Sequence, residues 1–562
     1  MAVEPDDPTW VPPIQFPRMT MKPENEVDTT NVQFKNSRTK GTGKGLHAEV
    51  AIKAGKLVAR IKKPLFNIVK RGYLDFTCDN CMATQREGGA MRGACYSTVD
   101  SNGLSSPQHL MACNGCKVLY YCNDKCKNEA WANHHKAECA VLANLPKQSH
   151  EYIEHESVRL VIRLLSLRAT GDSYEDLCND LKNLTPESLP ERYAGLCWSG
   201  DSVGWRAAVG TVGKYTRSGS EVLQQGMSEA KETYIAAGTN GIDIAHPKIN
   251  IDGSCEHDNS YIVTGTCFDF FTSKVNHSCA PNCIWVFNKS ELQLRTMKDV
   301  RKNEELMVAY DAYFGSRGKE TVFDEWGEES FEDVKYDPGT ILSHWTGEAH
   351  KMRRIAIKER CGFDCRCPFC VGGHFGPEEG SELDNLVRAE LSKPVPVNDM
   401  DLLDQVIDLA RTHKFGPNRF PMKTVNERLR ALQINSGLRA DVLRTSLTQY
   451  FLIEPKYNIK VPLDQRLTTF RILTEYSQTP GYISVGSFAM KLKLVRDTAK
   501  CFGPDSDVVI SLDRKFRMEL VEEKRPDIST LEMKFAGKMQ AKLLWAGFNE
   551  RQIEKAKPSE LL

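Results

Sequence analysis

Alternating apolar and polar residues predict short β-strands in two separate stretches of the chain. The first stretch covers residues 31–70, where Val50–Ile61 shows the clearest alternation. The second stretch contains four short runs, at Tyr261–Val263, Cys283–Phe287, Leu292–Leu294 and Leu306–Val308. Helical spacing is found instead around residues 158–165 and from about residue 395 onward, where one stripe consists of Leu403, Val406, Ile407 and Ala410. We therefore expect an α+β protein with a β-rich part and an all-helical C-terminal domain at residues 395–562.

Length and charge narrow the possibilities further. A chain of 562 residues is too long for one hydrophobic core, so several compact units are expected. The 74 basic residues balance 74 acidic ones, so no overall field draws the chain to nucleic acid or to an anionic membrane. No uninterrupted apolar run reaches the roughly 18 residues of a membrane span. The acidic, proline-rich residues 1–30 are typical of a flexible lead-in and lack a signal-peptide profile.

The 19 cysteines are concentrated in residues 78–139 and 361–370, with short spacings. In a large chain without a secretory signal this distribution favours metal binding over disulfides. It also predicts a reducing compartment, the cytoplasm and/or the nucleus.

The first cysteine cluster contains four pairs with the spacing of zinc ligands. These pairs are Cys78 and Cys81, Cys113 and Cys116, Cys122 and Cys126, and His135 and Cys139. A C-x2-C turn brings two thiolates to one ion, and an x3 spacing does the same on one face of a helix. Eight ligands make two closed, structural sites. Asp124 is a candidate N-cap for the helix that carries Cys126, and His134 is the alternative to His135.

A second group of motifs lies further along the chain. Asn276–Asn282 reads NHSCAPN, Glu304–Tyr310 reads EELMVAY, and residues 365–370 read CRCPFC. The three thiolates of Cys365, Cys367 and Cys370 are one short of a closed zinc site. Cys279 is the natural fourth ligand, which makes three zinc ions per chain.

The first cluster resembles the MYND zinc finger, above all in residues 121–126, Trp131 and residues 135–139. In that family the two sites interleave, which implies Cys78, Cys81, Cys122 and Cys126 on one ion and Cys113, Cys116, His135 and Cys139 on the other. The chain departs from the family in a long gap after Cys81 and in one extra residue between Trp131 and Cys139. The resemblance implies a possible proline-rich peptide as a partner of the finger.

The second group of motifs, together with Gly43–Leu46, resembles the SET domain of protein lysine methyltransferases. A MYND finger inserted into a SET domain is the layout of the SMYD-type subfamily. The resemblance implies a SET N-terminal part at 31–76, the finger at 77–140, a helical SET insertion at 141–258, a SET core at 259–350 and a post-SET zinc site at 351–375. It also implies a monomer that methylates a lysine of a protein substrate with S-adenosylmethionine.

The resemblance also assigns roles to individual residues. Tyr310 would be catalytic, with its hydroxyl at the methyl-transfer centre. The cofactor would be bound by Gly43, Lys44, Asn259, Asn276, His277, Tyr310 and Phe363. Without the resemblance, the glycines would suggest a hairpin turn, Tyr310 a core residue and His277 a structural histidine.

Two features depart from the family pattern. Cys361 stands where members commonly have a second tyrosine, which predicts an altered degree of methylation, an altered substrate or weak activity. The acidic insert at 315–350 is either a solvated loop or a docking surface for a basic peptide. The alternatives to a protein-lysine methyltransferase are therefore a MYND-type binding scaffold with little activity, and an enzyme that methylates a small-molecule amine.

Overall fold

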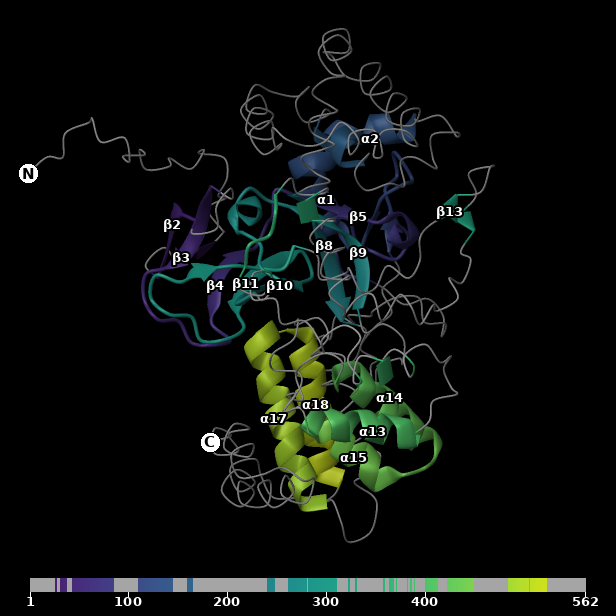
Figure 1. Cartoon of the computed structure of the whole chain (residues 1–562). Helices are drawn as coiled ribbons and strands as arrows, with labels where there is room; N and C mark the ends of the chain where they lie inside the picture. The colour runs from purple at the N-terminus through teal and green to yellow at the C-terminus, as the bar shows by residue number, and fades with distance from the viewer. Residues whose placement is uncertain are drawn as a thin grey trace, which may run out of the picture.

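The structure is a computed structural model of the whole chain. It describes residues 26–27, 31–37, 43–84, 110–144, 159–164, 240–247, 261–279, 281–310, 322–323, 329–330, 357–358, 363–367, 370, 382, 385–386, 389, 400–412, 422–448, 484–504 and 506–522. Within these residues small antiparallel sheets and a group of helices occupy separate regions (Figure 1).

Three small sheets form the β-rich region. The first has the strand order β1-β4-β11-β10 and consists of Glu26–Val27, Leu57–Ile61, Glu291–Thr296 and Cys283–Asn288. The second has the order β12-β3-β2 and consists of Glu305–Leu306, Lys44–Ala48 and Val32–Asn36. The third has the order β5-β9-β8 and consists of Phe66–Val69, Tyr261–Phe268 and Ile242–Pro247. Strands from both predicted stretches pair with each other, so the core forms only when the two stretches meet.

One shared hydrophobic core joins these sheets. Leu46 from β3, Ile61 from β4 and Leu292 from β11 are each buried in the same cluster. The segment Val50–Ile61 is not one strand as its alternation predicts. Only its second half forms β4, because Gly55 has a φ of 80° and turns the chain there. A side chain at Gly55 would also lie 2.7 Å from the Cβ of Lys500 in α17.

The cysteine-rich segment 78–139, called the finger below, lies beside the third sheet. Its elements are β6 (Met111–Ala112), β7 (Tyr120–Tyr121), α1 (Asp124–Ala130), a π-helical turn (Trp131–His135) and α2 (Lys136–Ala143). Residues 159–164 are helical, as their spacing predicts, and pack against both the finger and the third sheet. In the acidic insert the strands Val322–Phe323 (β13) and Glu329–Ser330 (β14) pair with each other.

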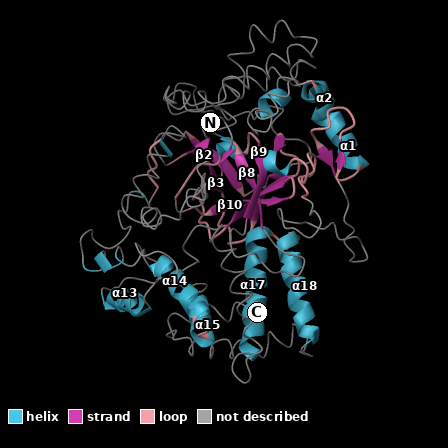
Figure 2. Cartoon of the chain, turned by 90° about the vertical axis from the view of Figure 1, so that its right-hand side faces the viewer, coloured by secondary structure: helices cyan, strands magenta, loops and turns pink. Residues whose placement is uncertain are grey.

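The helical region contains α13 (Met400–Thr412), α14 (Met422–Asn435), α15 (Arg439–Thr448), α17 (Ser484–Phe502) and α18 (Asp507–Glu522). The predicted stripe on α13 is confirmed at Leu403 and Val406, which are fully buried. Figures 1 and 2 both show α17 and α18 side by side, with one end of α17 against β10 and β11. No helix among the described residues is long and apolar enough to cross a membrane.

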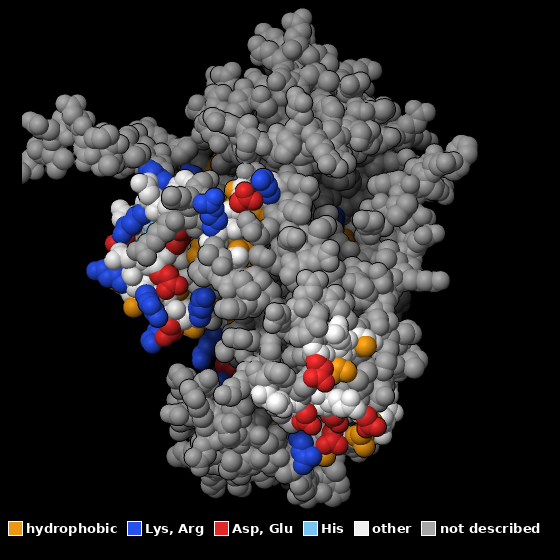
Figure 3. All heavy atoms as spheres, in the orientation of Figure 1, with side chains coloured by type: hydrophobic (Ala, Val, Ile, Leu, Met, Phe, Trp, Pro, Cys, Tyr) orange, Lys and Arg blue, Asp and Glu red, His pale blue; other side chains and the backbone are white. Residues whose placement is uncertain are grey.

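Charge is unevenly distributed over one face of the molecule. On the face that Figure 3 shows, Lys and Arg side chains gather over the sheets, while Asp and Glu side chains gather over the helical region below. Both regions also carry side chains of the other sign.

Candidate active site and metal centres

Twelve cysteine and histidine side chains form three groups, each with four ligand atoms within 4.8 Å of one another. The first group is Cys78, Cys81, Cys122 and Cys126, the second is Cys113, Cys116, His135 and Cys139, and the third is Cys279, Cys365, Cys367 and Cys370. Sulfur–sulfur distances within the groups include values from 3.4 to 3.9 Å. Four sulfurs at the usual Zn–S distance, arranged as a tetrahedron, lie about 3.8 Å apart. All fourteen cysteines that the structure describes are free, so donor type, number and spacing fit zinc in each group.

The helix of the finger departs from the sequence prediction in two ways. Asn123 rather than Asp124 is its N-cap, because the Asn123 side chain accepts a hydrogen bond of 2.8 Å from the N–H of Cys126. The helix then widens into the π-helical turn Trp131–His135. Such a turn absorbs one additional residue without ending the helix. The turn therefore accommodates the extra residue between Trp131 and Cys139, and it keeps His135 and Cys139 on the same side of the helix.

The second group includes His135 and not His134. The Nε2 atom of His135 lies 3.1 Å from Cys113 Sγ and 3.7 Å from Cys116 Sγ, whereas His134 Nε2 lies 3.4 Å from an oxygen of Asp79. Burial opposes a charge on His135, but the Cys116 thiol and the Glu138 carboxylate raise its pKa to about 10. Surroundings that stabilise a cation at this point are also suited to a divalent metal ion.

A buried network of charges attaches the finger to the sheets. Arg159 donates to Asp79 Oδ1 over 2.7 Å, and Arg163 donates to Asp79 Oδ2 over 2.7 Å and to Glu138 Oε1 over 2.9 Å. The same arginines donate to the backbone carbonyls of Val69 and Asn67 at β5. All four charged side chains are at most 2% exposed. The network therefore joins the finger, the 159–164 helix and the third sheet.

Asp79, His134 and Glu138 also come within 4.8 Å of one another, a spacing that could suit a metal ion. The two guanidinium groups already neutralise both carboxylates. Burial would raise the pKa of Glu138, but the positive charge of Arg163 lowers it to about 2. The negative charges of this cluster are therefore balanced without a metal ion. Glu138 also lies 3.4 Å from Nδ1 of His135, so it can orient that ring for the second group.

The glycine-containing loop before β3 lies against the NHSC segment. Gly43 has a φ of 66°, and its carbonyl accepts a hydrogen bond of 2.8 Å from the N–H of Ser37, which closes the β2–β3 hairpin. The loop is thus a hairpin turn, but it also meets a buried side chain from elsewhere, because Asn276 Nδ2 donates to the carbonyl of Lys44 over 3.3 Å. Asn276 belongs to a stretch whose backbone pairs with residues 307–308, since the Val308 N–H donates to the Asn276 carbonyl and the Ser278 N–H to the Val308 carbonyl.

Three aromatic rings meet beside the third cysteine group. The ring centroids of His277 and Tyr310 are 5.3 Å apart, and Phe363 lies 6.2 Å from both. The Tyr310 N–H donates to His277 Nδ1 over 3.0 Å, so Nε2 carries the proton of the neutral ring and points at Cys279 Sγ, 3.3 Å away. Tyr310 is 40% exposed and is therefore not a core residue. His277 links the candidate catalytic residue to the third cysteine group.

Two residues of the sequence prediction, Asn259 and Cys361, lie outside the described residues. Sequence reasoning also missed several groups that the structure brings to these sites, namely Ser37, Asp79, Glu138, Arg159, Arg163 and Glu305. Arg159 and Arg163 stand four residues apart within the apolar 159–164 helix, and this charged pair on a buried helix is the signal that could have revealed them.

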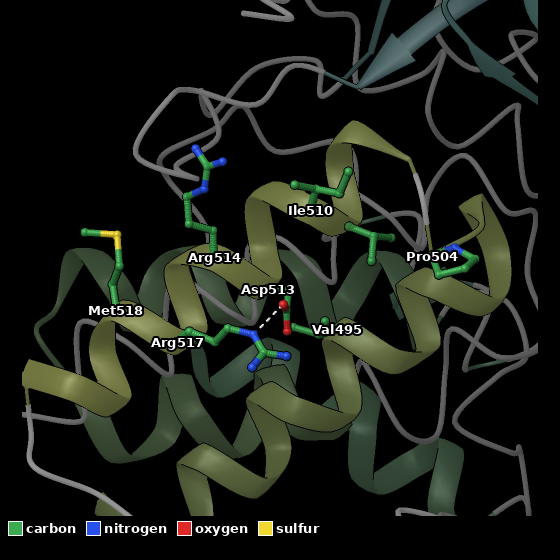
Figure 4. A pocket seen from close by; sticks show the side chains of 8 residues that line it. Val495, Pro504, Ile510, Asp513, Arg514, Arg517 and Met518 are labelled. Carbon is green, nitrogen blue, oxygen red and sulfur yellow. Dashed lines mark hydrogen bonds and ion pairs between the residues drawn. The ribbon is translucent and has the colours of Figure 1, made fainter. Parts of the chain in front are cut away.

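A separate cavity of about 770 Å³ lies in the helical region, on α17 and α18 (Figure 4). It is lined by Val495, Pro504, Val509, Ile510, Asp513, Arg514, Arg517 and Met518. It contains no residue of the candidate site, and its Asp513 and Arg517 pair with each other at 2.6 Å. The cavity is thus separate from the candidate site around Gly43, Asn276 and Tyr310.

Comparison with known proteins identifies a domain in this part of the chain. Residues 43–311 match the family model of the SET domain, a stretch that begins at the glycine loop and ends just after Tyr310. The chain carries a SET domain. Among curated proteins it is 27% identical over 276 residues to human histone-lysine N-methyltransferase SMYD3, covering 48% of this chain and 53% of that protein.

Other relatives point in the same direction. The chain is 24% identical over 268 residues to SET domain and MYND-type zinc finger protein 6 of Schizosaccharomyces pombe, covering 48% of this chain and 44% of that protein. It is 21% identical over 353 residues to mouse histone-lysine N-methyltransferase Smyd1, covering 60% of this chain and 55% of that protein. The matched part spans about half the length of these curated relatives. These matches support an SMYD-type family for the chain.

Proposed function

We propose that the chain is an S-adenosylmethionine-dependent protein-lysine N-methyltransferase. One observation carries this proposal. Within the SET domain, the buried amide of Asn276 bonds to the carbonyl of Lys44 beside the Gly43 turn, and the next residue, His277, accepts from the N–H of the half-exposed Tyr310. The printed names of the SMYD relatives support the same reaction class.

The proposed roles follow from where these side chains lie. The Gly43–Lys44 loop lies against the cofactor, and Asn276 and His277 hold its amino-acid and adenine portions through side chain and backbone. Phe363 packs on the adenine. When bound, the cofactor supplies an activated methyl group on a sulfonium. Tyr310 directs its hydroxyl to the transfer centre and so orients the lysine amine for in-line attack.

The substrate amine must be neutral before it can attack. An exposed lysine has a pKa of about 10.4, and burial in an apolar channel lowers that pKa by disfavouring the ammonium form. A strong protein base is then not required. The enzyme contributes positioning and desolvation, and a single tyrosine among aromatic rings is sufficient for that role.

The three cysteine groups are proposed zinc sites with structural roles. Each has four protein ligands, which leaves no open position for a water or a substrate. The third group holds the ring of His277 and the segment that carries Phe363, so its zinc would stabilise one wall of the active site. The free thiolates that zinc requires are consistent with the proposed location in the cytoplasm and/or the nucleus.

A methyl-transfer assay tests the proposed function. The purified protein is incubated with radiolabelled S-adenosylmethionine and a protein extract, and labelled products are identified by mass spectrometry. Label on lysine of a protein, from a histone or another source, supports the proposal. Label found only in small molecules would assign the reaction to a small-molecule amine instead. If the cofactor binds without any label, a Cys361→Tyr variant that raises the activity would show that Cys361 has weakened it.

The finger offers a second candidate function, the binding of a partner protein. Trp131 is 44% exposed and Met111 is 38% exposed, and apolar side chains of this size on a surface often mark an interaction site. We propose a proline-rich peptide as the ligand. Titration of such a peptide by calorimetry tests this, with Trp131→Ala as the variant that should lose binding. A protein that binds the peptide but not the cofactor would be a scaffold.

A further inference from the structure

Glu305 contacts Asn276, a proposed cofactor-binding residue, and no part of the proposed reaction uses it. It is the first residue of β12 and is 5% exposed. β12 pairs with β3, and Glu305 stands opposite His47 in this pairing. Its carboxylate projects toward Gly45, where a side chain could not fit: a Cβ at this position would overlap Glu305 Oε1 and lie 2.7 Å from Asn276 Nδ2.

Both oxygens of Glu305 have partners that belong to the candidate site. Oε1 accepts a hydrogen bond of 2.7 Å from Asn276 Nδ2, and Oε2 accepts one of 2.9 Å from the hydroxyl of Ser37. His47 Nε2 lies 3.9 Å from Oε2, while its Nδ1 donates to the carbonyl of Gly45 over 3.0 Å. The carboxylate is therefore held in place by the hairpin on one side and by the NHSC segment on the other.

These contacts determine which way the amide of Asn276 faces. Its nitrogen has two hydrogens, and its two neighbours, the Glu305 carboxylate and the Lys44 carbonyl, are both acceptors. Rotating the amide by half a turn would place its oxygen against both acceptors, so that arrangement is excluded. The oxygen of Asn276 accepts no hydrogen bond from any described residue. The residue as a whole is 7% exposed, and this oxygen is not among the fully buried polar atoms that lack a partner.

We propose that Glu305 is a positioning residue for the cofactor. This role rests on the proposed function. Glu305 orients the Asn276 amide so that its oxygen accepts a hydrogen bond from the α-ammonium group of S-adenosylmethionine. The carboxylate also polarises the amide through a charge-assisted hydrogen bond, which makes the oxygen a better acceptor for a cation. Gly45 is required because it leaves room for the carboxylate.

The variant that tests this role is Glu305→Gln. Glutamine keeps the shape of the side chain, but its own amide can donate as well as accept, so it no longer dictates the orientation of Asn276. A hydrogen bond to a charged group contributes more than one between neutral groups, and the difference corresponds to about a tenfold change in affinity. The matched control is Glu304→Gln. Glu304 accepts from the Arg301 N–H over 2.9 Å and from Asn282 Nδ2 over 3.1 Å, and it does not contact Asn276.

Two ligands distinguish positioning from a loss of fold. S-adenosylhomocysteine has the α-ammonium group, whereas 5′-methylthioadenosine has the adenosine but no amino-acid part. Calorimetry with the full-length protein should show that Glu305→Gln weakens S-adenosylhomocysteine about tenfold and leaves 5′-methylthioadenosine unchanged. Glu304→Gln should change neither. Ser37→Ala should weaken S-adenosylhomocysteine as well, by a smaller factor, because the carboxylate keeps its bond to Asn276.

The outcomes separate this inference from the proposed function. Wild-type protein that binds S-adenosylhomocysteine, together with a Glu305→Gln variant of equal affinity, would overturn the inference alone. An equal loss of both ligands in Glu305→Gln would also overturn it, because Glu305 would then act only on the fold. Wild-type protein that does not bind S-adenosylhomocysteine would overturn the proposed function, and the role of Glu305 with it.

Discussion

Arg163 donates to two buried carboxylates at once, and its replacement by methionine tests how the finger is attached to the sheets. Methionine fills much of the space of the arginine stem but removes three hydrogen bonds to carboxylates, of 2.7, 2.9 and 3.0 Å. Asp79 keeps Arg159 as a partner. Glu138 keeps the ring of His135 at 3.4 Å and the ring of His134 within 4.8 Å, but it loses its guanidinium partner and both hydrogen bonds from it.

Breaking a buried ion pair from one side costs about 3–5 kcal/mol, because the remaining charge stays desolvated. We expect Arg163→Met to reduce the free energy of unfolding of the finger and the adjoining sheets by about this amount. The control is Lys53→Met. Lys53 pairs with Asp299 at 2.8 Å in the same β-rich region, but the two side chains are 79% and 62% exposed. An exposed pair of this kind contributes about 1 kcal/mol or less.

Urea unfolding of the zinc-loaded protein, followed by release of zinc to a coloured chelator, is the assay. Zinc release reports on the β-rich region and the finger, because no Cys/His group lies in the described part of the helical region. Arg163→Met should release zinc at a clearly lower urea concentration than both wild type and Lys53→Met. If the two variants release zinc at the same concentration, the network does not attach the finger to the sheets.

Three further predictions concern the reaction, the metal and the core. Tyr310→Phe removes the hydroxyl but keeps the ring contacts with His277, so methyl transfer should fall by about 10²–10³-fold while S-adenosylhomocysteine still binds. Cys279→Ser removes one of four ligands from the third group, so elemental analysis should find two zinc ions per chain instead of three. Gly265→Ala forces a methyl group against the Ile68 carbonyl and to within 2.8 Å of a Met82 carbon, which should destabilise the protein by about 1–3 kcal/mol.

Each of these predictions has an outcome that contradicts it. Full methyl transfer by Tyr310→Phe would remove Tyr310 from the catalytic role. Three zinc ions in Cys279→Ser would mean that the third group does not need this thiolate. The control for Gly265→Ala is Gly72→Ala, where the space around the new Cβ is empty. Equal thermal midpoints for the two alanine variants would show that the β5–β9 pair tolerates the added methyl.

Much of the local structure follows from the order of residues. The alternating runs at Cys283–Phe287 and Leu292–Leu294 lie within β10 and β11, and the helical spacing near residue 160 corresponds to a helix. The ligand pairs could be recognised because metal ligands recur at spacings of two or three residues. The interleaving of pairs across the finger could not be worked out from those spacings, and it came from the resemblance to the MYND family.

The side-chain partners over long distances could not be predicted in the same way. Arg163 and Asp79 are 84 positions apart, and Asn276 and Glu305 are 29 apart. A charged residue in an apolar helix looks unfavourable on its own, since burial of an unpaired charge is costly. It becomes stable only when the fold supplies the opposite charge.

The sequence by itself determined the supply of ligands, the short strands, the helical C-terminal region and the motifs that mark a SET domain, because these depend on neighbours along the chain. The spacing to Cys139 already favoured His135 over His134, and the structure agrees, with His135 Nε2 3.1 Å from Cys113 Sγ. Only the tertiary structure decided that Glu305 faces Asn276 while Glu304 faces Asn282. Which of these two adjacent glutamates enters the site depends on how distant segments pack around them, and their spacing along the chain does not contain that information.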